Sequence, residues 1–384
     1  MNRKQRRAAA KRNAAPGSVV AGSAGKAARH QKQGREVLLT LGQQLHGEGR
    51  LEAADRYYVQ ALRQDPNDAD ALRLRGALAH QIGNHEAAVE LLRRAASRLP
   101  KSAEVRVHLA AALEALGRMT PAEAAYREAA RLAPSDPSVR MQLGAFLRLA
   151  GKFEEAETVL RAARAGGPDL ASAAYHLAAL LIQTSRPKEA LVEAEAAHAL
   201  DPDDLDILIV LGVARQHTHD FDRAEAAFRE VDRLKPGNLG AAINLASLLI
   251  AQGRLEEAEG TARAARAADP ESVPALINLG VVLSAAERFE EGEAVYRKAL
   301  DSAPDHADGW GNYANLLRMA GRHEEALEAY DKALALDPKS PRHRFQKGMG
   351  LLALGRLAEG WALYEDGFAC GERGDAPTHP APRW

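Results

Sequence analysis

The stretch ADGWGNYANLLRMAGRHEEALEAYDKALALDP, residues 307–338, contains the pattern that decides the fold. It ends on a proline, and prolines recur every 34 residues, at positions 66, 100, 134, 168, 202, 236, 270, 304 and 338. A fixed period of this length is the signature of a repeat architecture, in which each helical unit packs on its neighbours. The sequence therefore predicts ten units, starting at residues 35, 69, 103, 137, 171, 205, 239, 273, 307 and 341.

Each unit is expected to form two antiparallel helices. Proline cannot continue the helix before it, and an Asp, Asn or Ser after it can accept a backbone hydrogen bond from the next helix. Seven of the nine junctions offer such a capping residue: Asp68, Ser102, Asp136, Asp204, Asn238, Ser272 and Ser340. Positions 8 and 20 are Gly or Ala in all ten units, as expected where two helices cross closely, and larger residues such as Trp310, Tyr313, Leu317 and Tyr330 are expected around the crossing.

Residues 307–338 resemble the consensus of the tetratricopeptide repeat, and the resemblance covers residues 35 to about 370. It implies an all-α fold, a right-handed α-solenoid or α-α superhelix of about ten helix pairs, whose first helices line the concave face. Residues 1–34 are expected to be a basic, disordered tail. Residues 371–384 are expected to be a Pro-rich linker and are a candidate point of truncation.

Composition and charge exclude several classes of protein. The first 35 residues contain ten Lys or Arg and no acid, but no aromatic residue lies among them to stack on bases, so a solvated tail is expected rather than nucleic-acid or anionic-membrane binding. The single cysteine, Cys370, excludes an internal disulfide framework. Neither a membrane span nor a signal peptide is predicted, and a cytoplasmic location is expected.

The sequence predicts no catalytic, cofactor or metal site, and therefore no enzyme in the residues present. HEAAV at His85 and HEEAL at His323 lack the second histidine that a zinc-protease helix needs. Glutamate pairs such as Glu154 with Glu155 and Glu256 with Glu257 begin the second helices, where they favour the helix N-terminus electrostatically.

The candidate binding residues lie at positions 5, 6 and 9 of the first helices, which point away from the repeat core. Position 6 is Asn244, Asn278 and Asn312 in successive units, and Asn315 lies at position 9. A carboxamide both donates and accepts, so a row of them can pair with the backbone of an extended peptide. The alternative is that these asparagines bond neighbouring helices and hold the stack.

The series resembles the asparagine ladder in the repeat region of O-linked N-acetylglucosamine transferases, although earlier units have other residues at position 6, including His176. Beside it, position 5 is predicted to form a largely apolar trough. Its members are Tyr175, Ile209, Ile243 and Ile277.

The last unit, GRLAEGWALYEDGF at residues 355–368, is unusual because it contains Trp361 and no polar capping helix follows it. An exposed aromatic patch of Trp361, Tyr364 and Phe368 is expected there, and such patches mark interfaces. The stretch also resembles the closing motif of bacterial tetratricopeptide proteins that continue into a glycosyltransferase-like domain.

Two functions follow from these patterns. The first is a protein-interaction scaffold that binds an extended peptide or a partner protein in the concave groove. The alternative is the substrate-recognition region of a glycosyltransferase whose catalytic domain is not in these residues. Neither the identity of the partner nor the oligomeric state can be predicted from the sequence.

Overall fold

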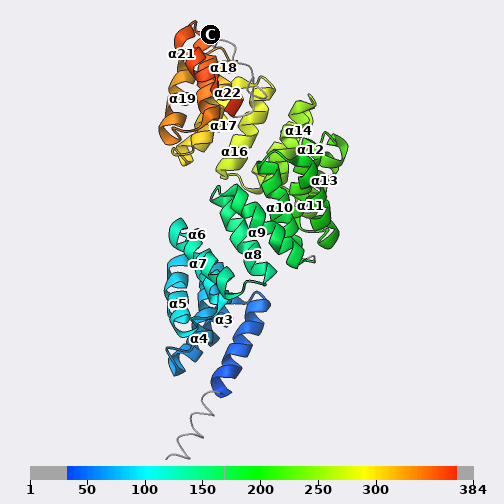
Figure 1. The fold of residues 1–384 in the computed structure, drawn as a ribbon. Coiled ribbons are helices and arrows are strands. Elements are labelled where there is room, and N and C mark those ends of the chain that lie inside the picture. The colour runs from blue at the N-terminus through cyan, green and yellow to red at the C-terminus, as the bar shows by residue number, and fades with distance from the viewer. Residues whose placement is uncertain (1–32, 168, 370–384) are drawn as a thin grey trace, which may run out of the picture. The chain divides into compact units, whose positions relative to one another are not determined.

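The computed structural model describes residues 33–167 and 169–369 (Figure 1). The predicted Pro-rich linker and all but two residues of the predicted tail lie outside the described residues. Residues 33 and 34, which were expected to belong to the tail, are instead helical. Within the described residues every regular element is a helix. The chain divides into two compact units, residues 1–180 and 181–384, and each is described by itself.

The helices alternate between first helices of 13 residues and second helices of 14 residues. The first unit contains helical residues 33–47, then α3 (Leu51–Gln64), α4 (Ala69–Gln81), α5 (His85–Arg98), α6 (Ala103–Ala115), α7 (Met119–Leu132), α8 (Pro137–Leu149) and α9 (Phe153–Gly166). The division between the units falls within α10 (Ala171–Gln183).

The second unit continues the same alternation and ends on two short helices. Its elements are α11 (Pro187–Leu200), α12 (Leu205–His217), α13 (Phe221–Leu234), α14 (Leu239–Ala251), α15 (Leu255–Ala268), α16 (Val273–Ala285), α17 (Phe289–Ser302), α18 (Ala307–Met319), α19 (His323–Leu336), α20 (Pro341–Ala353), α21 (Leu357–Tyr364) and α22 (Asp366–Ala369). Each first helix here packs on the second helix of its own pair, on that of the preceding pair, and on neighbouring first helices.

Side-chain caps start the first helices, as predicted from the residues after the prolines. All seven predicted residues accept a backbone hydrogen bond from the first turn. At α18 the cap is His306, whose Nδ1 accepts from the Gly309 amide at 3.0 Å. Sequence reasoning missed this cap because histidine is not a preferred capping residue.

Small residues allow the two helices of a pair to approach closely. A Cβ atom on Gly280 would lie 2.6 Å from Cζ of Tyr296, whose side chain is fully buried, and one on Gly348 would lie 3.0 Å from the Gly360 carbonyl oxygen. Ala258 is also fully buried. The tight crossing expected at positions 8 and 20 is therefore present.

The residues expected around the crossing differ in burial. Tyr313, Leu317 and Tyr330 are buried in one apolar cluster. Trp310 packs on the edge of that cluster, donates from Nε1 to the Pro304 carbonyl at 2.9 Å, and is covered by the Lys332 ammonium at 4.2 Å.

The turn between the two helices of a pair needs a residue with positive φ. Glycine supplies it in seven of these turns, for example at Gly253 with a φ of 74°. Ser185, His219 and Glu287 adopt φ values of 57–65° at the equivalent position in three other repeats. The left-handed conformation is unfavourable for residues with a Cβ, so these three turns carry local strain.

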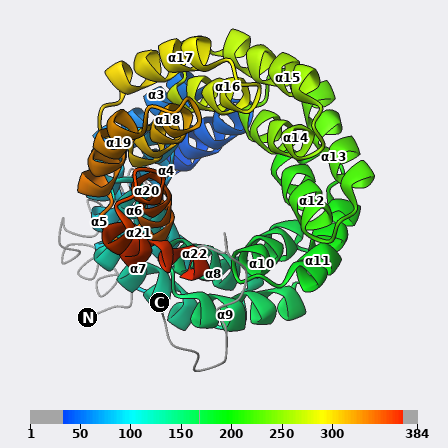
Figure 2. The same cartoon turned by 90° about the horizontal axis from the view of Figure 1, so that it is seen from above.

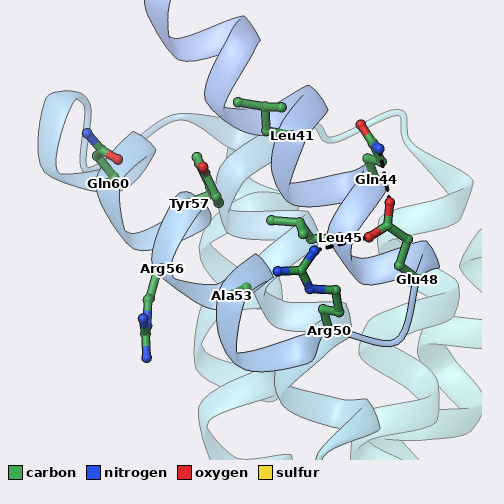
Figure 3. Close-up of a pocket in the computed structure, with 9 residues that line it drawn as sticks. All are labelled: Leu41, Gln44, Leu45, Glu48, Arg50, Ala53, Arg56, Tyr57 and Gln60. Carbon is green, nitrogen blue, oxygen red and sulfur yellow. Dashed lines mark hydrogen bonds and ion pairs between the residues drawn. The ribbon is translucent and has the colours of Figure 1, made fainter.

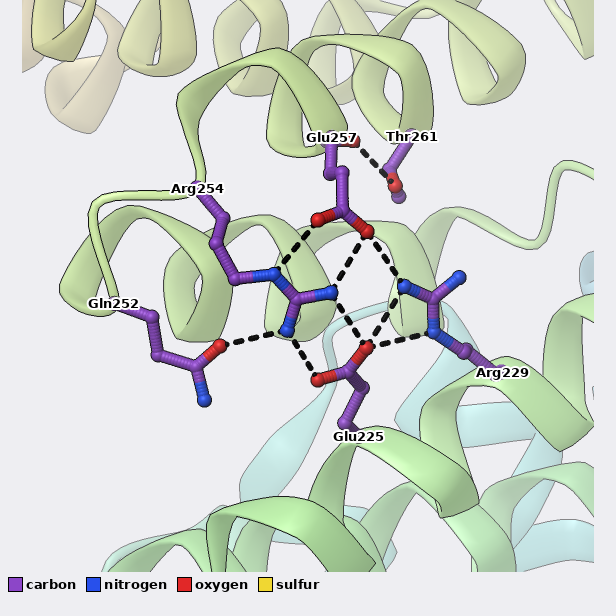
Figure 4. Close-up of polar contacts among 6 residues, drawn as sticks. All are labelled: Glu225, Arg229, Gln252, Arg254, Glu257 and Thr261. Atoms are coloured by element: carbon purple, nitrogen blue, oxygen red, sulfur yellow. Dashed lines mark hydrogen bonds and ion pairs between the residues drawn. The ribbon is translucent and has the colours of Figure 1, made fainter.

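A network of ion pairs connects successive second helices in the second unit (Figure 4). The guanidinium of Arg254 bonds Glu257 at 2.7 Å on its own helix and Glu225 at 2.6 Å on the preceding second helix. Arg229 bonds the same two glutamates. The hydrogen bond from Arg254 is the main cause that lowers the pKa of Glu225.

The same arrangement repeats one and two units later. Arg288 bonds Glu259 and Glu291, and Arg322 bonds Glu293 and Glu325. Isolated exposed ion pairs stabilise a fold only slightly, and a repeated network such as this one is stronger evidence of stabilisation. Glu257, which was expected to favour a helix N-terminus, thus also links one repeat to the preceding one through Arg229.

Candidate peptide-binding groove

A groove of about 450 Å³ runs across four first helices of the second unit, α14, α16, α18 and α20. Figure 2 shows α14, α16 and α18 on the inner side of this unit, with α15 and α17 outside them. Ten residues line the groove: Ile243, Ser247, Ile250, Pro274, Ile277, Asn278, Val281, His306, Asn312 and Arg342. Four of these, Ile243, Ile277, Asn278 and Asn312, belong to the predicted binding set.

The 34-residue period brings these side chains together. It places Ile243 and Ile277 at the same position of successive first helices, and it does the same for Asn278 and Asn312. Ile250 and Val281 extend the apolar surface. The Ile243 side chain is 39% exposed although it is large and apolar, so part of this surface is open to a ligand.

Asn278 is the unusual residue of the groove. It is one of three buried polar residues in the described chain, with 7% of its surface exposed, and its Nδ2 has no hydrogen-bond partner among the described residues. Asn312 lines the groove one helix further along. Adjacent packed helices lie about 8–10 Å apart, which corresponds to about three residues of an extended chain.

The other two predicted asparagines are engaged within the protein. Asn244 donates from Nδ2 to the Gly240 carbonyl of its own helix at 2.8 Å. The Oδ1 of Asn315 accepts a hydrogen bond from the hydroxyl of Tyr330, which lies on the second helix of the same pair. The alternative role, in which an asparagine bonds a neighbouring helix and holds the stack, therefore applies to Asn315. No described residue bonds Nδ2 of Asn278.

The residues that line the groove include one arginine, Arg342, and no Asp or Glu. Nδ1 of His306 accepts the capping hydrogen bond, so the neutral ring carries its proton on Nε2. Behind the groove the buried His343 lies 3.3 Å from Asp308, and burial lowers the pKa of His343.

Three further residues of the predicted binding set lie elsewhere. Tyr175 and His176 are on α10 in the first unit, with ring centroids 4.8 Å apart, and burial lowers the pKa of His176 to about 4. Ile209, on α12, packs against a cluster that contains Leu208 and Val231 and does not line the groove.

The predicted C-terminal patch is only partly described. Trp361 is 48% exposed, and its ring contacts Tyr364 edge to face at 5.0 Å. Tyr364 is half-buried and also packs on Phe345. Phe368 falls in α22, but its side chain lies outside the described residues. Of the two described side chains, Trp361 is the one that presents an aromatic surface.

A second hollow, of about 540 Å³, lies between helical residues 33–47 and α3 in the first unit (Figure 3). Leu41 and Tyr57 line it together with charged residues. Glu48 at its rim is bonded by Gln44 and paired with Arg50. Among its lining residues no buried polar atom lacks a partner, in contrast to Asn278 in the groove.

The described residues contain no group of three or more His, Cys, Asp or Glu side chains placed to hold a metal ion. A search of the same residues for a helix long and apolar enough to cross a bilayer also found none.

Two family profiles, both described as tetratricopeptide repeat, match the sequence. One matches residues 39–103, 147–206 and 277–341, and the other matches residues 79–145 and 217–279. The chain belongs to the tetratricopeptide repeat family. The matched residues include the helices α14, α16 and α18 of the groove. None of the curated proteins searched matches the sequence.

Solved structures of helical repeat proteins have the same fold. Yeast Tom70 has a TM-score of 0.50 and 16% identity, covering 88% of this chain and 92% of its own. Cut9–Hcn1, an APC/C hetero-tetramer, has a TM-score of 0.53 and 15% identity, covering 88% and 74%. A tetratricopeptide repeat protein from Parabacteroides merdae has a TM-score of 0.51 and 16% identity, covering 61% and 93%. These similarities confirm the predicted all-α solenoid class.

Proposed function

We propose that this tetratricopeptide repeat protein is an interaction scaffold that binds an extended peptide segment of a partner protein in the groove of α14, α16, α18 and α20. The observation that carries the proposal is the Asn278 side chain, which is buried in the groove wall with Nδ2 unpartnered. A buried polar group without a partner costs about 1–3 kcal/mol. A peptide carbonyl entering the groove would supply the missing partner.

The groove also fits the geometry of an extended chain. The carboxamides of Asn278 and Asn312 lie on adjacent helices, so they can reach peptide groups about three residues apart. The apolar residues beside them provide contact area for side chains. Repeat proteins commonly mediate protein interactions through such surfaces, and a cytoplasmic location, supported by the single cysteine, is part of the proposal.

The test uses the full chain and a random dodecapeptide library displayed on phage. Selected peptides are synthesised with a fluorescent label, and their affinities are measured by anisotropy for the wild type and for Asn278→Ala/Asn312→Ala. Loss of two hydrogen bonds is expected to weaken binding about tenfold. The melting temperature is expected to stay within about 2 °C, because neither carboxamide bonds another helix.

The matched control is Asn67→Ala, an exposed asparagine in the loop before α4. It should change neither affinity nor melting temperature. Equal affinities of the wild type and the double variant would refute the proposal, and so would failure to select any peptide.

The alternative function, a substrate-recognition region of a glycosyltransferase, depends on two sequence resemblances, that of the C-terminal motif and that of the asparagine series. None of the matches named above is described as a glycosyltransferase. We therefore do not extend the proposal to it.

A further inference from the structure

We infer that His80 and His85 form a binding site for a divalent metal ion of the zinc, nickel and copper class in the second repeat. His80 lies in the last turn of α4, and His85 is the first residue of α5. Their Nδ1 atoms are 3.2 Å apart, and their ring centroids are 5.0 Å apart. The inference is independent of the proposed function, because both residues lie in the first unit and the peptide groove lies in the second.

The distance between the two nitrogens fits a shared metal ion. A bond from zinc to an imidazole nitrogen is about 2.0–2.1 Å long. Two such bonds to nitrogens 3.2 Å apart enclose an angle of roughly 100° at the metal. This angle lies between the right angle of octahedral coordination and the tetrahedral angle, and imidazole suits zinc, copper and nickel alike. An ion can therefore bind both Nδ1 atoms with the backbone of the two helices in place.

Both rings can take the protonation state that a metal requires. Metals bind neutral imidazole, and burial, followed by the adjacent His85 ring, lowers the pKa of His80. In the neutral pair one Nδ1 donates a hydrogen bond to the other. On metal binding the donor ring transfers this proton from Nδ1 to its own Nε2, so both Nδ1 lone pairs face the ion and the net protonation of the pair is unchanged. The two rings are half-buried, so water can complete the coordination.

The turn between the two helices holds the rings in place before any ion binds. Gly83 has a φ of 82°, and the amide of Asn84 donates to the Ala79 carbonyl at 2.8 Å. The side chain of Asn84 also caps α5 by accepting from the Ala87 amide at 3.2 Å. Because these contacts fix the hairpin, little conformational entropy is lost when the ion binds.

The histidine pair is a local feature and not part of the repeat pattern. Only the second repeat has histidine at both positions 12 and 17. His46, at position 12 of the first repeat, instead contacts Gln81 and Tyr58 through its two ring nitrogens. No third His, Cys, Asp or Glu in the described part of the chain joins the pair. The site therefore has two protein ligands, and low selectivity among these metals is expected.

The test is calorimetric titration of the metal-free full chain, carrying no affinity tag, with zinc chloride and with nickel chloride. One ion is expected to bind at this site. His80→Asn and His85→Gln keep a group that can hydrogen bond but remove a ligand, so each should weaken binding by at least about tenfold, the smallest loss seen when a group that only supports a ligand is removed. The matched control is His217→Ala, which removes an exposed histidine at the end of α12 and should leave binding unchanged.

Hydrogen exchange of the wild type locates the ion without any substitution. At a metal concentration about 100 times the dissociation constant, opening of the hairpin of α4 and α5 should be suppressed about a hundredfold. Amides in the last turn of α4 and the first turn of α5 should exchange more slowly by that factor, and EDTA should reverse the effect. The inference is overturned if the wild type binds no ion, if binding survives both histidine substitutions, or if exchange slows only in other helices.

Discussion

Substituting two glycines of one repeat would measure the free-energy cost of a positive φ in the turn between the paired helices. Gly253 lies in the turn before α15 with a φ of 74°, and Gly260 lies inside α15. A Cβ atom added at either position would meet no atom within 4 Å. Replacing either glycine by alanine therefore adds the same methyl group in the same repeat without a clash. The two sites differ in backbone conformation, which is left-handed at Gly253 and helical at Gly260.

The two substitutions should have opposite effects on stability. A left-handed alanine costs about 1–2 kcal/mol, and restriction of the unfolded chain returns about 0.4–1 kcal/mol, so Gly253→Ala should destabilise by about 0.8 kcal/mol, the difference between the middle values. Gly260→Ala should stabilise by about 1 kcal/mol, because alanine is the better helix former. Urea unfolding followed by circular dichroism at 222 nm measures both midpoints. Equal midpoints for the two variants would refute the reasoning.

The substitution Glu287→Gly tests the cost of a positive φ in the opposite direction, by removing a side chain from such a turn. Glu287 has a φ of 57° in the turn before α17, and glycine removes the cost of that conformation. A midpoint at or above that of the wild type is expected, and a clear loss of stability would show that the glutamate side chain contributes more than the turn strain costs.

Three further predictions concern hydrogen bonds and ion pairs. The bond from Arg322 is the main cause that lowers the pKa of Glu293 below its usual 4.5, so the contribution of this pair is complete above pH 4.5 and is lost as the pH falls through the lowered value. Glu293→Gln should therefore lower the melting temperature at pH 7, and the two melting temperatures should converge as the pH falls through the lowered pKa of Glu293; parallel curves would contradict this. Tyr330→Phe should cost about 1 kcal/mol by urea unfolding through the lost bond to Asn315, and an unchanged midpoint would exclude that bond. Asp204→Ala should cost about 1 kcal/mol by removing the α12 cap, and hydrogen exchange should rise first at that helix if the reasoning is correct.

The fold could be predicted because it depends on local rules repeated at a fixed interval. The proline spacing predicted helix pairs, and the caps at Asp204 and Ser272 follow from residues a few positions away. The ion pairs of Arg254 could not be predicted in the same way. Glu225 is 29 residues from Arg254, and their pairing depends on which faces of successive second helices meet.

The candidate site was predicted in part. The period placed Ile243 and Ile277 at one position of the repeat and Asn278 and Asn312 at the next, and all four line one groove of the structure. The sequence could not distinguish Asn315 from them, because residue type alone does not show that its oxygen accepts a bond from Tyr330. The lack of a partner for Nδ2 of Asn278 is likewise a property of packing.

The short sequence separation between side chains that bond neighbouring repeats has a consequence for folding during synthesis on the ribosome. Contacts between neighbouring repeats join residues close in sequence, as in Arg254 with Glu225, 29 residues apart, and His46 with Gln81, 35 apart. A repeat can therefore complete its contacts as soon as the following one has left the ribosome. At roughly 5–20 residues per second, the chain adds one repeat every 2–7 s, so early repeats can be folded while later ones are still being made.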